Sequence, residues 1–117
     1  MSSETVYIIQ AEDTPYIKIG LTYQASVIPR LKNLQTGCPL ELKLLATTQK
    51  FTEAELHQAF RDYRVRGEWF WCRDRLESFV NNLIRLQYKH PERYKPRFDG
   101  AYDKFCAERF EQVIESN

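Results

Sequence analysis

Five polar residues in the first part of the chain carry side chains that suit chemistry on a phosphate group. They are Tyr7, Lys18, Arg30, Glu53 and His57. A glutamate carboxylate is a hard oxygen ligand for Mg²⁺ or Mn²⁺, and an arginine guanidinium offers phosphate oxygens a planar pair of donors. Taken singly, such residues are usually packed in a strand or solvated on a helix. Only their order along the chain can therefore indicate whether they have a chemical role.

The elements that must position these residues begin with two strands. Residues 5–9 and 16–21 are rich in β-branched and aromatic residues, and the short polar loop between them contains Pro15, which predicts a hairpin. A helix should start near Pro29 and stop at Thr36-Gly37. Alternating apolar and polar residues over 40–48 predict a third strand.

The apolar period becomes helical after Phe51, with Thr52 in the position of an N-cap. We expect Glu53, His57 and Arg64 to lie along one edge of the buried face of this helix. Residues 66–71 break the helix at glycine and predict a turn followed by a packed strand or loop.

Two further helices are expected in the last third of the chain. Asp74 could cap one that ends before Pro91, and residues 99–115 have the pattern of an amphipathic helix. The predicted fold class is α+β: a small three-stranded antiparallel sheet flanked by helices in a β-β-α-β-α core, with additional C-terminal helices. We expect one domain over residues 1–90 and a helical extension over residues 91–117, packed on it or next to it.

The net charge of +1 hides an uneven distribution. Residues 1–13 hold three acids and no base, and residues 98–117 hold five acids and two bases. The middle, residues 14–97, therefore holds 15 bases and 8 acids. A basic middle can attract a polyanion although the whole chain is nearly neutral, and a solvated surface of unequal charge is the plainer interpretation.

Other classes of protein are less consistent with the sequence. The sequence contains no run of about 18 apolar residues, which would predict a membrane span, and its N-terminus lacks a signal-peptide pattern. We therefore expect a cytoplasmic protein, or a nuclear one in a eukaryote. Cys38, Cys72 and Cys106 are widely spaced and contain no CxxC pair, which predicts free thiols.

The order of four motifs resembles the GIY-YIG nuclease family, and its phage-type subfamily most closely. The motifs are KIGxT from Lys18, R-x-x-x-L-Q-T-G-x-P from Arg30, E-x-x-L-H-x-x-F from Glu53 and R-x-x-G-E-W-F from Arg64, preceded by Val6-Tyr7-Ile8. The resemblance covers roughly residues 4–72. It implies a metal-dependent endonuclease of a phage, a mobile element or a defence system, acting on the phosphodiester bonds of nucleic acid, with DNA as the expected partner.

The resemblance also implies a role for each residue. Tyr7 is the candidate general base or water-orienting group, and Lys18 would lower the pKa of its phenol from the neighbouring strand. Arg30 would bind the non-bridging phosphate oxygens, Glu53 would hold Mg²⁺ or Mn²⁺, and His57 would polarise the metal-bound water or contact the scissile phosphate.

Two positions depart from the family pattern, since Lys18 stands where the family has tyrosine and Val6 where it has glycine. This leaves the identity of the base open, and Tyr16, two residues from Lys18 on the same strand face, could substitute. Glu68 would either brace the helix that carries Glu53 or take part in metal chemistry, and we favour bracing.

A second function is compatible with the same residues: a nucleic-acid-binding module with this fold and little or no turnover. The acidic last helix could buttress the sheet or bind a protein partner, and we favour the buttress. Neither function involves a membrane.

Overall fold

The computed structural model describes residues 4–90, 96 and 98, and shows a β-sheet with helices on both faces. Its strands are β1 (Thr5–Ala11), β2 (Tyr16–Thr22), β3 (Leu42–Thr48), β4 (Arg64–Arg66) and β5 (Trp69–Trp71). Its helices are α1 (Ile28–Thr36), α2 (Glu53–Ala59) and α3 (Asp74–Gln87), with a short 3₁₀ turn at Arg61–Tyr63. The predicted helix over residues 99–115, Cys106, and the buttress or protein contact considered for that helix lie outside the described residues.

All strand pairs are antiparallel, and the order across the sheet is β3-β1-β2-β5-β4. The prediction of an α+β fold is confirmed, but the sheet has five strands instead of three. The additional pair is a hairpin built around Gly67, whose φ of +55° is a conformation that glycine adopts readily. Arg64 belongs to this hairpin and not to the edge of α2.

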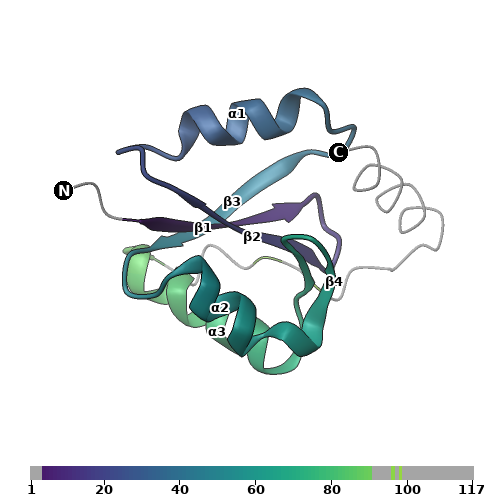
Figure 1. The fold of residues 1–117 in the computed structure, drawn as a ribbon, viewed down its shortest axis with the longest axis vertical. Helices are drawn as coiled ribbons and strands as arrows, with labels where there is room; N and C mark the ends of the chain where they lie inside the picture. Colours follow the sequence, from purple (N-terminus) through teal and green to yellow (C-terminus); the bar gives the residue numbers. More distant parts are fainter. Residues whose placement is uncertain (1–3, 91–95, 97, 99–117) are drawn as a thin grey trace.

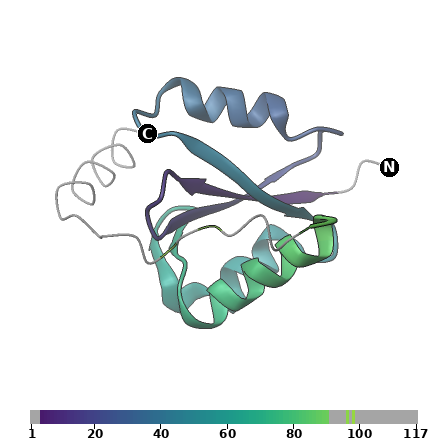
Figure 2. The same cartoon turned by 180° about the vertical axis from the view of Figure 1, so that it is seen from behind.

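The two faces of the sheet are covered by different helices (Figures 1 and 2). Helices α2 and α3 lie together on one face, and α1 lies on the other. Strand alternation divides the side chains accordingly: Val6, Ile8, Ile17 and Ile19 belong to the cluster under α2 and α3, whereas Tyr7 belongs to the cluster on the α1 face.

Three predicted elements have the expected bounds within a few residues. Helix α1 carries Pro29 in its first turn. Helix α2 has Thr52 as its N-cap, in a capping box with Glu55. Asp74 is the first residue of α3 and not its cap, because the N-cap position falls on Arg73.

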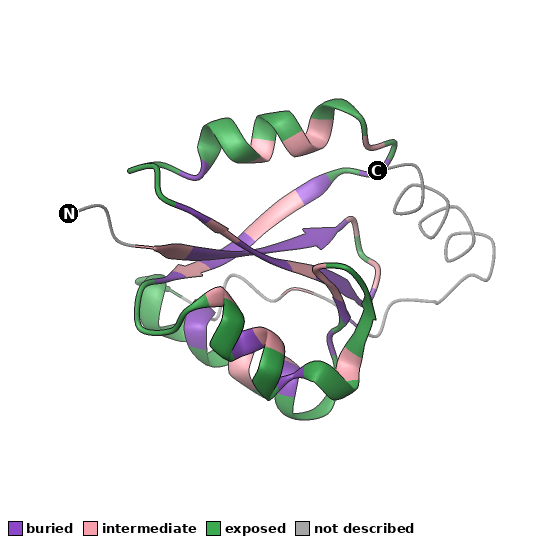
Figure 3. Ribbon diagram, in the orientation of Figure 1, coloured by how far each residue is buried: buried purple, intermediate pink, exposed green. Residues whose placement is uncertain are grey.

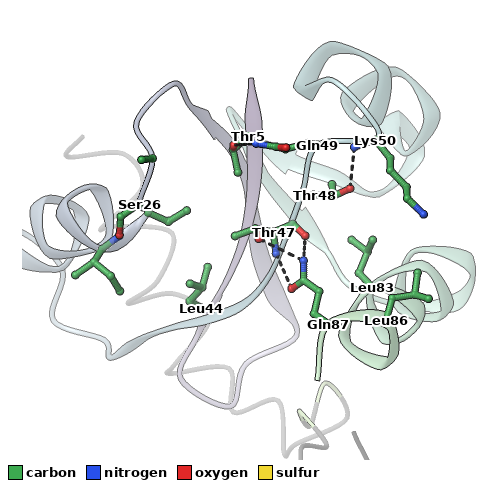
Figure 4. Close-up of a pocket in the computed structure, with 13 residues that line it drawn as sticks. Thr5, Ser26, Leu44, Thr47, Thr48, Gln49, Lys50, Leu83, Leu86 and Gln87 are labelled. Carbon is green, nitrogen blue, oxygen red and sulfur yellow. Dashed lines mark hydrogen bonds between the residues drawn. The ribbon is translucent and has the colours of Figure 1, made fainter. Parts of the chain in front are cut away.

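The end of α3 is fastened to the outer strand β3, as Figure 4 shows. The Gln87 side-chain amide accepts a hydrogen bond from the Thr47 N–H at 3.0 Å and donates one to the Thr47 carbonyl, so it pairs with the strand edge as a peptide group would. A hollow of about 850 Å³ beside this contact is lined by residues that include Leu44, Leu83 and Leu86. None of the five residues first considered for chemistry is among its lining residues.

Candidate functional site

The site is built around Tyr7, which lies in the central part of the sheet and is 2% exposed. Its cross-strand partner on β2 is Gly20. A Cβ atom at position 20 would stand 2.4 Å from both the Cζ and the hydroxyl oxygen of Tyr7, closer than any non-bonded contact allows. Glycine at this position therefore lets the tyrosine ring lie flat across β2.

The cation that acts on Tyr7 is Arg30, on α1. The Arg30 guanidinium lies near the phenol, and its charge and its hydrogen-bonding capacity both act to lower the pKa of Tyr7. Burial and the nearby Glu68 carboxylate act in the opposite direction and prevail, so that the pKa of Tyr7 lies above its usual value of 10.0. Tyr7 is a neutral phenol at pH 7.

The predicted pairing of Tyr7 with Lys18 is wrong in register. Lys18 stands opposite Ile9, two cross-strand pairs along the hairpin from the pair of Tyr7 and Gly20. Its ammonium group lies 3.3 Å from the Glu68 carboxylate and 6.0 Å from the centre of the Trp69 ring. Lys18 therefore holds Glu68 in place, while the contact with the phenol is made by Arg30.

Glu53 begins α2 and is partly buried. Its backbone N–H donates a hydrogen bond to the Glu4 carboxylate at 2.9 Å. The pKa of the Glu53 carboxyl is raised by burial first and by Glu68 second, while His57 and Lys18 oppose this and Glu4 adds to it. Burial and the two neighbouring carboxylates therefore outweigh His57 and Lys18 in their effect on the pKa of Glu53.

His57 joins α2 to the sheet. Its Nε2 atom lies 2.8 Å from the Ile19 carbonyl oxygen, which can only accept, so Nε2 carries the proton. The ring packs edge-on against Phe70, with 5.0 Å between centroids, and Nε2 lies 3.9 Å from the Glu53 carboxylate. Any contact of His57 with water or phosphate would have to use Nδ1.

Tyr16 is placed apart from this group. It lies on the same face of β2 as Lys18, as predicted, but at the opposite end of the strand from Gly20, where it pairs with Trp71. It is 4% exposed and lines a different hollow, together with Trp71 and Arg73. The structure thus brings Tyr7, Lys18, Arg30, Glu53 and His57 to one region and leaves Tyr16 outside it.

Two acidic residues contribute more than the sequence suggested. The N-terminus of α2 is capped by its own Thr52 and Glu55, so Glu68 does not brace the helix by capping it. Glu68 acts instead through its charge, which raises the pKa of both Tyr7 and Glu53. Glu4 was not predicted at all, because a glutamate ahead of the first strand carries no recognisable spacing to α2.

The donor set fits a divalent cation bound mainly through Glu53. Mg²⁺ typically takes one or two protein carboxylates and completes its shell with water and substrate oxygens. Glu53 supplies one such oxygen donor, and a cation would offset the repulsion it experiences from Glu68 and Glu4. Over the described part of the chain, no group of three or more His, Cys, Asp or Glu side chains converges as a closed metal cage would need.

A groove of about 520 Å³ leads into this region. Its walls are the end of α1 and the β4–β5 turn, and its lining includes Lys18, Asn33, Thr36, Glu68 and Trp69.

In the described segments, no helix is both long enough and apolar enough to cross a membrane.

Comparison with known proteins gives one match. The family model described as the T5orf172 domain matches residues 4–86, which extends beyond residue 72 and includes most of α3. Searches among curated proteins and among solved structures give no match.

Proposed function

The chain belongs to the T5orf172 domain family, and from that premise we propose that it is a GIY-YIG-type, divalent-metal-dependent endonuclease that hydrolyses the phosphodiester bonds of DNA. The family suggests a nucleic-acid-related function of phage type. The proposal depends chiefly on one observation: Arg30 and Glu53, from two helices on opposite faces of the sheet, both lie close enough to Tyr7 to affect the pKa of its phenol.

In the proposed hydrolysis, a water oxygen forms a bond to phosphorus while the bond from phosphorus to the 3′ oxygen breaks. The attacking water loses a proton and the departing oxygen gains one. Mg²⁺ or Mn²⁺, when bound at Glu53, would polarise the phosphate and lower the pKa of a bound water. Arg30 would balance the charge that grows on the non-bridging oxygens.

The raised pKa of Tyr7 favours one of its two proposed roles. A neutral phenol can donate a hydrogen bond and accept another, but it is a poor base near pH 7. We therefore assign Tyr7 to orienting the water or a phosphate oxygen. Lys18 positions Glu68 and adds positive charge to the groove.

The test is cleavage of end-labelled single-stranded and duplex DNA and RNA of one sequence, with Mg²⁺, Mn²⁺ or EDTA. We expect internal cleavage of DNA that requires the cation and stops in EDTA. Retention of DNA on the protein with no cleavage under any of these conditions would favour the alternative, a binding module that lacks turnover.

A further inference from the structure

The end of β5 that lies away from Glu53 carries an exposed tryptophan. Trp71 is 42% exposed, although its neighbours on either side, Phe70 and Cys72, are buried. Because Trp71 pairs with Tyr16 and Trp69 pairs with Lys18, the side chains of both tryptophans lie on the α1 face of the sheet. Trp71 thus shares its face with Tyr7, which belongs to the α1-side part of the candidate site.

The exposed indole is accompanied by arginine. The Arg73 guanidinium lies 4.6 Å from the centre of the Trp71 ring, a stacking distance for a cation and an aromatic ring. Arg64 and the exposed Val65 line the same hollow, whose volume is about 430 Å³. Two acidic residues lie nearby, and each forms an exposed ion pair with an arginine: Asp74 lies 3.4 Å from Arg73, and Asp62 lies 3.3 Å from Arg75.

We propose that Trp71 and Arg73 form a stacking subsite for one unpaired base of the nucleic-acid substrate, one or two nucleotides from the scissile phosphate. This proposal rests on the proposed function and narrows its substrate to nucleic acid with a single-stranded segment at the site. A base inside a duplex has both its faces covered by neighbouring bases, whereas an unpaired base presents a face to an indole or a guanidinium.

The spacing along the sheet supports this assignment. Each step from one same-face residue to the next covers two residues, about 6.6 Å of strand. Trp71 therefore lies one step from the level of Lys18 and two steps, about 13 Å, from the level of Gly20 and Tyr7. An extended strand whose phosphate lies at Tyr7 and Arg30 can place a base one or two nucleotides away over Trp71.

Charge favours nucleic acid over a protein partner at this surface. Residues 61–75 contain five arginines against three acids, and the middle of the chain as a whole is basic. An arginine stacked on an aromatic ring can offer its remaining donors to a phosphate of the same strand. A protein surface with complementary acids could use the same groups, and the experiment separates the two.

The experiment measures binding in EDTA, so that cleavage does not interfere. A fluorescein-labelled oligothymidylate and a hairpin duplex with the same number of phosphates are titrated with wild type, Trp71→Leu and Trp71→Phe. Leu86→Ala, which removes another exposed apolar side chain on the other face, is the control. Thermal unfolding of each variant verifies that it folds.

We expect Trp71→Leu to weaken binding of the single strand by about fivefold or more, within the range for the loss of one stacked base, and to leave binding of the duplex nearly unchanged. Trp71→Phe should retain part of the affinity. Quenching of tryptophan fluorescence by oligothymidylate should fall in both Trp71 variants, since Trp69 would be the remaining tryptophan.

Equal losses for single strand and duplex, or no loss for either, would overturn the subsite, and a wild type that does not bind oligothymidylate would also overturn it. The surface around Trp71 and Arg73 would then be a candidate binding site for a protein partner. These outcomes are distinct from failure of the nuclease assignment: a protein that binds single strands through Trp71 but never cleaves keeps the subsite and loses the nuclease. A protein that cleaves DNA equally well with and without Trp71, and whose binding of single strands does not depend on Trp71, keeps the nuclease assignment and loses the subsite.

Discussion

The two faces of the sheet use the same strands for different purposes. On the face under α2 and α3, the strands contribute aliphatic and aromatic residues that are almost fully buried, among them Ile8, Ile17 and Phe70. On the other face the strands also bury residues such as Ile9 and Ala11, but α1 has no buried residue of its own (Figure 3). The groove at the end of α1 remains open. We infer that stability comes mainly from the first face, and that the second can therefore hold polar groups.

Phe70 and Trp71 test this difference directly, because they are neighbours on β5 that point to opposite faces. Phe70→Ala should cost about 3–5 kcal/mol of unfolding free energy, the usual range for a buried phenylalanine. Trp71→Ala should cost clearly less. Urea unfolding monitored by circular dichroism measures both, and equal costs would show that the two faces contribute equally.

Gly20 tests how closely the polar face is packed around Tyr7. Gly20→Ala would drive a methyl group into the Tyr7 ring, so we expect a loss of about 1–3 kcal/mol in stability together with most of the cleavage activity. The control is Gly37→Ala, because a Cβ at position 37 meets no atom within 4 Å.

The double variant Gly20→Ala with Tyr7→Leu should recover part of the stability and none of the activity. If Gly20→Ala were as stable as Gly37→Ala, the contact between the ring and β2 would not limit the position of Tyr7.

Arg30 should matter for turnover much more than for folding, since it is exposed on α1 and acts on the pKa of Tyr7. Arg30→Lys keeps the charge and loses the planar pair of donors. We expect cleavage at saturating DNA to slow at least about tenfold, equivalent to roughly 1.4 kcal/mol of transition-state stabilisation. Lys32→Gln, at another exposed position of the same helix, is the control and should be near wild type. A large parallel fall in the thermal midpoint would make Arg30 structural.

Glu68 should have a smaller effect, on the pH dependence. Its negative charge raises the pKa of Glu53 and of Tyr7, so Glu68→Gln should lower both. Glu53 would then stay ionised to lower pH, and the acid limb of the cleavage rate should move to lower pH; an alkaline limb due to Tyr7 should move in the same direction. Glu41→Gln, at an exposed glutamate outside the site, should leave the profile in place. Movement toward higher pH would contradict the electrostatic account.

The raised pKa of Glu53, due first to burial and second to the Glu68 charge, also affects the stability of the fold. Because the folded-state pKa of Glu53 is raised, its contribution to stability is fully present below the unfolded value and is lost as the pH rises through the folded value. Comparing the pH dependence of unfolding of wild type and Glu53→Gln should show this loss in the wild type alone.

The long elements could be predicted from the sequence because each shows several periods of its pattern. β4 and β5 are three residues each, too short for alternation to be visible, and their pairing depends on the Gly67 turn. Tyr7, Lys18, Arg30, Glu53 and His57 lie in one region, whereas the predicted substitute base Tyr16 lies apart and Lys18 is not the partner of Tyr7. The hairpin register that places Gly20, and not Lys18, opposite Tyr7 is set by the four-residue connection between β1 and β2, whose conformation the sequence pattern does not specify.

The most direct test of the central claim, that the candidate site binds a metal through Glu53 for phosphodiester hydrolysis, is a Mg²⁺ titration of DNA cleavage. Wild type is compared with Glu53→Gln and with the control Glu41→Gln, and DNA binding in EDTA is measured for all three. We expect saturable cleavage by wild type and the control, and none by Glu53→Gln although it binds DNA normally. Equal cleavage by Glu53→Gln and wild type across the titration would contradict the assignment of Glu53 as the metal ligand.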